Sequence, residues 1–382
     1  MTAGELVPRF TARFGSAEHG QIFRAPGRVN LIGEHTDYTL GFVLPIALEM
    51  ACYIAAAEAS GSRITIYSAD QDEEISWEVA DIPNLVPASH WSDYFAGVAQ
   101  QLVRAGVELT PGRFFISSEV PVGSGLSSSA ALEVASALAL LHGRSFDPLK
   151  LAQLCQRAEI DFVGNPCGIM DQYVSVFGEA HKALELDCRS LTHQAVDIPE
   201  GVAIYAVNSM VKHELSGSAY RDRVDECATA ADAMSRVYPE IRTLRDATPA
   251  QLGQVKMPSL IARRARHVIS ENLRVELWMQ AAARGDLARM GDLFVESHRS
   301  LQHDYEVSAP ELDFLVDAAI GIEGVYGARM TGGGFGGCTV NLVRPDAAGQ
   351  FQSEVAAAYK ERFGIDPVIY HCIPSQGAGE LD

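Results

Sequence analysis

The alternation of hydrophobic and polar residues divides the chain into a strand-rich first part and a helix-rich later part. Short runs typical of strands occupy residues 21–79, and they end with Ile64–Tyr67 and Ile75–Val79. Helical periodicity then appears at Tyr94–Ala105, Ala130–Leu141 and Leu149–Phe162, with a strand-like run at Phe114–Ser117. The first part therefore begins with a sheet and continues with a strand, a glycine-rich loop and a helix in succession.

The later part is different in character. After a strand-like run at Ala183–Asp187, residues 191–201 have little pattern, and we interpret them as a linker. A strand is expected at Val202–Val207, followed by long helices between residues 219 and 321, and sheet is expected to return only with Cys338–Val343 and Pro367–Cys372. Because 382 residues exceed the size of most single cores, we predict two domains, 1–195 and 196–382, with a site between them.

The composition narrows the function classes. A formal net charge of -19 argues against a non-specific nucleic-acid binder, which needs concentrated Lys and Arg. The most apolar stretch, Gly41–Ala59, is interrupted by Pro45, Glu49 and Glu58, so no membrane span is expected. Seven scattered cysteines without a C-x-x-C pair indicate reduced thiols. We expect a cytoplasmic protein with small-molecule partners, without nucleic acid or membrane, as a monomer or weak oligomer.

The segment from Pro121 to Ala131 is a candidate phosphate-binding loop. Gly123 and Gly125 permit close approaches, and the serines that follow open a helix whose free amides would face an anion. The loop lacks the lysine of a Walker A sequence and the third glycine of a dinucleotide-binding motif. Taken alone, it could equally be a serine-rich helix cap after a turn.

Four other segments carry a resemblance to a known family. The run Ala25–Tyr38 resembles the signature of galactokinases, which belong to the GHMP group of small-molecule kinases. Residues 121–131 resemble the second motif of that group and Met330–Thr339 its third, and residues 166–172 and 296–313 match as well. The resemblance implies two α/β domains, the first like ribosomal S5 domain 2 and the second ferredoxin-like, with the active site in the cleft between them.

The resemblance also implies roles for individual residues. Asp171 corresponds to the base for the anomeric hydroxyl, and Arg28 to its partner at the transferred phosphoryl group. Burial would raise the pKa of Asp171 and a close Arg28 would lower it by roughly 1–3 units, so the two effects oppose one another. Ser129 and Glu159 correspond to ligands of Mg²⁺, whose preference is for oxygen. Without the resemblance, Glu159 would be interpreted as a solvated helix carboxylate, and Arg28 with Asp171 as an ordinary ion pair.

The resemblance also implies two sets of binding residues, one for the sugar and one for ATP. Asp37 would form hydrogen bonds with the 3- and 4-hydroxyls of the sugar. An aspartate at this position is also typical of an Asx turn. For galactose the implied set is Glu34, His35, Asp37, Gly168, Asp171 and Tyr220. For ATP it is Pro121, Gly123, Ser124, Gly125, Leu126, Ser127, Ser128, Ser129 and Ala130, with Trp91 and Tyr94 at the adenine ring. Trp91 and Tyr94 are also consistent with a packed aromatic pair.

Two local sequences modify this assignment. Galactokinases commonly have Asn-x-Gly after the Asp-Tyr pair, whereas this chain has Thr39-Leu40-Gly41. We expect the turn to persist, with a different rim to the sugar pocket. Gly332–Gly337 fits G-x-G-x-x-G, yet a strand follows where a dinucleotide site needs a helix. We therefore expect this third motif to lie against the phosphate loop and the sugar site.

The activity that the resemblance implies is transfer of the ATP γ-phosphoryl group to α-D-galactose, giving galactose 1-phosphate and ADP in galactose metabolism. One alternative keeps the chemistry with N-acetylgalactosamine or L-arabinose as the sugar, although Thr36 and Asp37 favour galactose. Another is a galactose and ATP sensor, similar to the non-catalytic yeast paralogues of galactokinase. Those sensors are shortened in the serine-alanine part of the loop, whereas Ser127–Ala131 is complete here.

Overall fold

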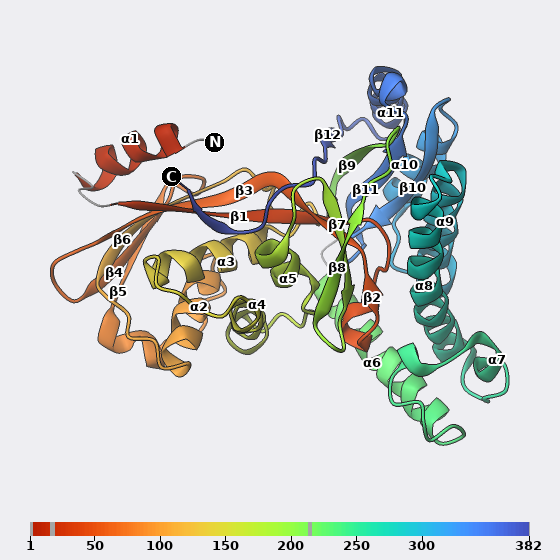
Figure 1. The fold of residues 1–382 in the computed structure, drawn as a ribbon, viewed down its shortest axis with the longest axis horizontal. Helices are drawn as coiled ribbons and strands as arrows, with labels where there is room; N and C mark the ends of the chain where they lie inside the picture. Colours follow the sequence, from red (N-terminus) through yellow and green to blue (C-terminus); the bar gives the residue numbers. More distant parts are fainter. Residues whose placement is uncertain (1–2, 16–19, 213–215, 382) are drawn as a thin grey trace.

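The computed structural model describes residues 3–15, 20–212 and 216–381. In these residues, the first part of the chain forms a six-stranded sheet with the order β13-β1-β3-β6-β4-β5 (Figure 1). Neighbouring strands are antiparallel except β4 and β6, which are parallel. The strands are β1 (Gln21–Asn30), β3 (Pro45–Glu58), β4 (Arg63–Ser68), β5 (Glu73–Glu78), β6 (Gly112–Ser118) and β13 (Gly379–Leu381).

Both faces of this sheet are covered by helices. Tyr53 and Phe115 pack on the same face as α1 (Ala3–Phe14), whereas the adjacent residues Ile54 and Phe114 enter the main core on the other face. This is the alternation that a strand imposes on successive side chains. The helices on the main-core side are α2 (Asp93–Arg104), α3 (Ser128–Leu141), α4 (Pro148–Arg157) and α5 (Met170–Phe177) (Figure 1).

The second part of the chain has a four-stranded antiparallel sheet with the order β10-β11-β9-β12. Its strands are β9 (Ala203–Lys212), β10 (Val325–Thr331), β11 (Gly336–Val343) and β12 (Val368–His371). The helices of this part are α6 (Ser216–Ser235), α7 (Pro249–Leu252), α8 (Ser259–Ala283), α9 (Leu287–Ser300), α10 (Pro310–Ile320) and α11 (Ala348–Phe363). α10 and α11 share a core with Tyr205 and Val207 of β9.

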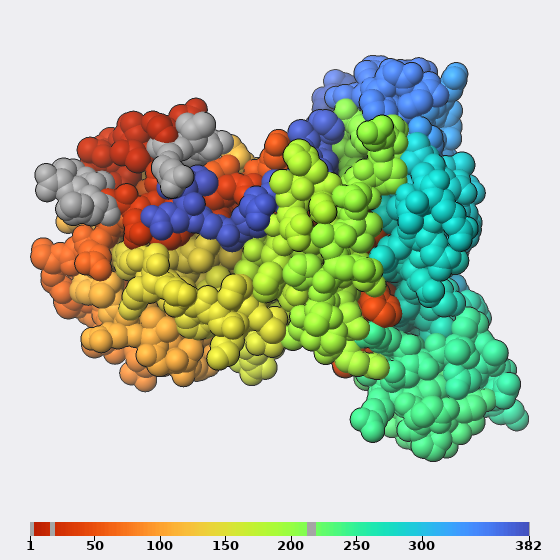
Figure 2. Space-filling model, in the orientation of Figure 1, coloured from red at the N-terminus to blue at the C-terminus, as the bar shows by residue number. Residues whose placement is uncertain are grey.

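A small sheet with the order β2-β7-β8 lies between the two larger ones (Figure 1). Its strands are β2 (Phe42–Val43), β7 (Lys182–Asp187) and β8 (Thr192–Asp197). Figure 2 shows the green segment that contains β7 and β8 filling the space between the first part and the helices of the second. Ile54 of β3 and Val340 of β11 belong to one continuous core, so the two parts are packed together.

Two predictions about the fold were wrong. Residues 191–201 are not simply a linker, because they contain β8, an exposed and largely polar strand with a weak sequence signal. Sheet returns before Cys338, with β10, whose buried Arg329 interrupts the apolar pattern. The helices α1, α5 and α11 were not predicted. The division at residues 195 and 196 stays a prediction; it falls inside β8, and β13 returns the end of the chain to the first sheet.

No helix in the described part of the chain is long and apolar enough to cross a membrane. Most of the apolar stretch Gly41–Ala59 is β3, a strand at the centre of the first sheet.

Candidate active site

A pocket of about 580 Å³ opens where the two parts of the chain meet. It is lined from the first part by the sugar signature and the phosphate loop, and from the second part by Tyr220 and residues 331–337. The predicted site residues that line it are Arg28, Glu34, His35, Asp37, Trp91, Tyr94, Gly123, Gly125, Ser127, Ser128, Ser129, Glu159, Gly168, Asp171 and Tyr220. The structure thus brings together segments that are far apart in the sequence.

The phosphate loop connects β6 to α3. Gly123 and Gly125 have φ values of 74° and 82°, a region that glycine adopts at low cost, and Ser127 at the N-cap of α3 has φ 63°. The Ala131 amide donates to the Ser127 carbonyl at 3.1 Å, so the amides of residues 128–130 precede the first intrahelical bond. Such amides are available to an anion.

Four predicted ATP-binding residues do not line the pocket: Pro121, Ser124, Leu126 and Ala130. The Ser124 side chain is buried, and its hydroxyl donates to the Pro121 carbonyl at 2.8 Å. Leu126 and Ala130 are fully buried. The side chains of these residues shape the loop, and any contact they make with a phosphate has to come from the backbone.

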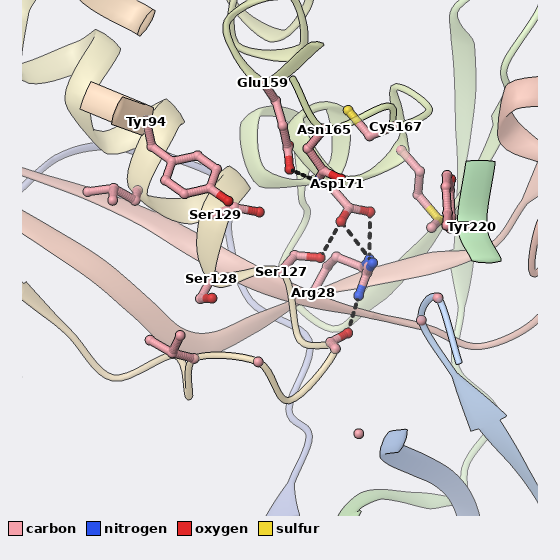
Figure 3. A pocket seen from close by; sticks show the side chains of 18 of the residues that line it. Arg28, Tyr94, Ser127, Ser128, Ser129, Glu159, Asn165, Cys167, Asp171 and Tyr220 are labelled. Carbon is pink, nitrogen blue, oxygen red and sulfur yellow. Dashed lines mark hydrogen bonds and ion pairs between the residues drawn. The ribbon is translucent and has the colours of Figure 1, made fainter. Parts of the chain in front are cut away.

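Arg28 and Asp171 form a bidentate pair beside the phosphate loop (Figure 3). Arg28 Nε donates to Asp171 Oδ1 at 2.9 Å and Nη2 to Oδ2 at 2.8 Å, while Nη1 donates to the Gly125 carbonyl at 2.6 Å. Burial alone would lower the pKa of Arg28, but the charges of Asp171 and Glu34 outweigh it and raise the pKa. Ser127 Oγ also donates to Asp171 Oδ2, at 2.5 Å. The loop, the arginine and the carboxylate therefore form one hydrogen-bonded unit.

The third glycine motif lies against both the phosphate loop and the sugar signature, as predicted. A Cβ added to Gly337 would lie 2.9 Å from the Ser124 carbonyl oxygen, and one added to Gly332 would lie 3.2 Å from that of Gly125. Glu34 Oε1 accepts hydrogen bonds at 2.9 Å from the Thr331 hydroxyl and from the Gly332 amide. The second part of the chain thus fixes Glu34.

The sugar signature forms a tight turn that keeps its polar groups in the pocket wall. His35 has φ 61°, its Nδ1 lies 2.9 Å from the Tyr38 hydroxyl, and burial lowers its pKa to about 3. Burial and the nearby Asp171 raise the pKa of Asp37 to about 7. Leu40 adopts a left-handed conformation with φ 61°, and the Gly41 amide donates to the Thr36 carbonyl at 2.8 Å. The turn therefore persists without the usual asparagine, as predicted.

The residues predicted for adenine, Trp91 and Tyr94, and the candidate metal ligand Glu159 line the same pocket. The Trp91 indole donates to Glu73 Oε2 at 2.8 Å. Burial and then the charge of Glu159 raise the pKa of Tyr94 to about 12. Glu159 is almost fully buried and accepts from Asn165 at 2.7 Å (Figure 3). It also accepts from Gln172 at 2.8 Å. Burial raises the pKa of Glu159 as well.

Helix α8 supplies two residues that the sequence analysis missed. Glu271 is fully buried, and its Oε1 accepts from the amides of Gly33 and Glu34 at 3.0 and 3.3 Å. His267 Nε2 lies 3.1 Å from the Glu34 carbonyl, and burial lowers the pKa of this histidine to about 4, so the neutral ring donates there. These residues anchor the backbone of the sugar signature from the opposite half of the molecule. The sequence signal that could have found them is the presence of polar residues on the buried side of a long helix.

A sheet-and-helix first domain with a glycine-serine phosphate loop, facing a second domain across a shared pocket, defines a small-molecule kinase of the GHMP type. Residues 93–179 match the GHMP kinases N terminal domain, residues 278–361 match GHMP kinases C terminal, and residues 8–58 match the galactokinase galactose-binding signature. The solved structure of a mevalonate kinase covers 92% of the chain with a TM-score of 0.68 at 18% identity, a likeness in fold alone.

The similarity to galactokinases is much closer. A galactokinase of Roseiflexus sp. (strain RS-1) is 44% identical over 100% of this chain and 98% of the relative. One of Chloroflexus aggregans is 44% identical over 91% of each. The crystal structure of Lactococcus lactis galactokinase complexed with galactose has a TM-score of 0.94 at 33% identity and covers 99% of both chains. The chain belongs to the galactokinase family, and its fold is the two-domain GHMP kinase fold.

Gly168 offers a direct test of the sugar side of the pocket. A Cβ added there would lie 1.8 Å from Asp37 Oδ2, so Gly168→Ala must displace that carboxylate. We expect the KM for galactose to rise by about 10-fold or more, because a displacement near 1 Å can cost two orders of magnitude, while the KM for ATP stays near that of the wild type. Steady-state kinetics with each substrate varied measures both. Gly349→Ala is the matched control, since a Cβ at this exposed helical glycine meets no atom within 4 Å. An unchanged KM for galactose in Gly168→Ala would contradict the assignment.

Proposed function

We propose that this galactokinase transfers the γ-phosphoryl group of ATP to the anomeric oxygen of α-D-galactose, with Asp171 and Arg28 as the catalytic residues. The observation that carries the proposal is the bidentate Arg28–Asp171 pair, which joins the phosphate loop through Gly125 and Ser127. The pair lines the same pocket as Asp37 and Gly168 of the sugar side. A sugar hydroxyl and a terminal phosphate can therefore meet beside it.

In this mechanism the anomeric oxygen attacks the γ-phosphorus while the bond from that phosphorus to the β,γ-bridging oxygen breaks. Asp171 orients the hydroxyl and accepts its proton, and Arg28 stabilises the charge that develops on the transferred group. A loose phosphoryl-transfer transition state needs positioning and charge neutralisation more than a strong nucleophile. The bidentate contact suits this requirement, because it holds both side chains in one orientation.

We assign Ser129 and Glu159 to the magnesium ion that accompanies ATP, which would neutralise phosphate charge. Both line the pocket, and a hydroxyl with a carboxylate is the oxygen donor set that Mg²⁺ prefers. Among the described residues, no group of three or more His, Cys, Asp or Glu side chains could hold a metal ion by itself. This fits an ion that arrives with its phosphate and water ligands. We place the adenine ring at Trp91 and Tyr94, and the triphosphate at the free amides of α3.

For the sugar we assign Glu34, His35, Asp37, Gly168, Asp171 and Tyr220, all in the pocket wall. Carboxylates that are already fixed, as Glu34 is by Thr331 and Gly332, can pair sugar hydroxyls without reorganisation. The seven cysteines are free, and six of them are buried, which supports our proposal of a cytoplasmic location.

The decisive experiment is an ADP-release assay with purified protein, Mg²⁺ and ATP. We expect rapid ADP release with galactose and slower release with N-acetylgalactosamine or L-arabinose. A faster rate with either alternative sugar would identify that sugar, and not galactose, as the preferred substrate. A folded protein that binds galactose and ATP without releasing ADP would be a sensor instead.

The raised pKa of Asp37 predicts a pH dependence of galactose binding. Because this pKa is about 7, Asp37 is protonated below that pH in the free protein and ionised above it. The ionised carboxylate is the stronger acceptor for sugar hydroxyls, so we expect the Kd for galactose to fall as the pH rises from 6 to 8. His35 and His267 stay neutral in this range, since their pKa values are about 3 and about 4.

Calorimetric titration with galactose alone checks this prediction, because it removes the titration of ATP from the measurement. Asp37→Asn is the control variant, whose weaker binding should lose the pH dependence. A wild-type Kd that does not change between pH 6 and 8 would contradict the prediction.

A further inference from the structure

The Glu159 carboxylate is held at both of its oxygens. Asn165 Nδ2 donates to Oε1 at 2.7 Å, and Gln172 Nε2 donates to Oε2 at 2.8 Å. Glu159 itself lies in a π-helical segment, Ala158–Val163, which ends at Gly164 with φ 81°. Such segments are rare and often occur at functional sites. The side chain is therefore fixed in direction by two neutral amides.

Gln172 connects this carboxylate to the phosphate-loop helix. It follows Asp171 on α5 and is fully buried, and its Nε2 also donates to Glu133 Oε2 at 2.9 Å. Both hydrogens of the amide are thus used on carboxyl groups, one of Glu159 and one of Glu133 on α3. A single side chain links the segments that carry the phosphate loop, the candidate metal ligand and the proposed base.

Glu133 is placed to anchor this amide. It is fully buried, and burial followed by the charge of Glu159 raises its pKa well above the usual range. Its second oxygen, Oε1, is buried without a hydrogen-bond partner among the described residues. Glu133 therefore holds the Gln172 amide through Oε2.

We propose that Gln172 and Asn165 are positioning residues that fix the Glu159 carboxylate for the magnesium ion of Mg·ATP, with Glu133 as the buried anchor of the Gln172 amide. The inference rests on the proposed role of Glu159 as a metal ligand. Mg²⁺ demands near-octahedral geometry with short ligand distances, so a carboxylate free to rotate would bind it less well. Residues that orient a metal ligand typically contribute a factor of about 10–100 to metal affinity.

The test uses Mn²⁺ as a paramagnetic substitute for Mg²⁺, titrated into the full-length protein with ADP and followed by electron paramagnetic resonance. Asn165→Ala removes the hydrogen bond from the exposed Asn165 to Glu159. Gln172→Met removes the hydrogen bond from the buried Gln172 amide while keeping the length of the side chain. We expect each variant to raise the Kd for Mn²⁺ by about 10-fold, to lower kcat, and to leave the Kd for galactose unchanged. Glu133→Leu should weaken Mn²⁺ binding in the same way, and Glu133→Gln, which keeps an acceptor for Gln172, should restore it.

The outcomes separate this inference from the proposed function. If the wild-type protein with ADP binds no Mn²⁺, the assignment of Glu159 as a metal ligand fails. If the wild type binds Mn²⁺ and both variants bind it equally well, the positioning role is overturned. Should Gln172→Met fail to fold, Asn165→Ala decides alone, because Asn165 lies at the surface and its loss leaves the core intact. A purely structural role would change thermal stability without changing the Kd for Mn²⁺.

Discussion

Asp171→Asn is expected to lower kcat by about 10²–10⁴-fold while the protein stays folded and binds galactose with little change. Asparagine has nearly the same shape, and its oxygen can still accept one hydrogen bond from Arg28 or Ser127. It cannot accept the proton of the anomeric hydroxyl, and general-base catalysis typically contributes a factor of that size. Steady-state kinetics with calorimetric binding of galactose would separate the two effects.

The control for this substitution is Asp161→Asn. Asp161 forms an i,i+4 ion pair with Arg157 at the surface, 2.7 Å apart, and such pairs contribute little. We expect wild-type kcat in that variant. Turnover near the wild-type level in Asp171→Asn itself would remove Asp171 from the role of base and leave it as an orienting carboxylate or a structural ion pair.

The parts of the site that lie within one short segment were predictable from the sequence. The run Ala25–Tyr38 and the loop at 121–131 each carry their own turn residues and polar groups, and their positions in the pocket follow from the resemblance. The long strands of the first sheet were predictable as well, because they alternate or run apolar. β8 and β10 were not, since an exposed strand and a strand with a buried arginine have no clear apolar period.

Apart from the Arg28–Asp171 pair and the packing of the third glycine motif, which the resemblance implied, the contacts that hold the site in place were not predicted, because they join residues far apart in the chain. Ser127 was expected to contact ATP, but its hydroxyl bonds to Asp171, 44 positions away. Ser124 was placed in the same binding set, yet its hydroxyl closes the turn of the loop. Glu271 and Glu34 are 237 positions apart. A single sequence without pairing information gives no signal for such contacts, which depend on how the two parts of the chain pack.

The second large effect is expected at one of these unpredicted contacts, in Glu271→Ala. The carboxylate is fully buried and accepts from the Gly33 and Glu34 amides, from the Ser297 hydroxyl at 2.7 Å and from Arg274 at 2.7 Å. Burial alone would raise the pKa of Glu271, but the charges of Arg274 and Arg329 and the hydrogen bond from Ser297 lower it to about 2, so the group is ionised at neutral pH. Removing one partner of a buried ion pair typically costs 3–5 kcal/mol of folding free energy, because the other charge is left unpaired.

Urea denaturation would measure this loss, which we expect to reach about 3 kcal/mol or more. Glu276→Ala, at an exposed position of the same helix, should change the free energy of unfolding by less than about 0.5 kcal/mol. Since Glu271 anchors the backbone that carries Glu34, the Kd for galactose should rise in Glu271→Ala under conditions where the variant is folded. A destabilised variant with wild-type galactose affinity would show that α8 supports the fold but does not position the sugar signature. If both quantities change, the second domain shapes the sugar site of the first through this carboxylate.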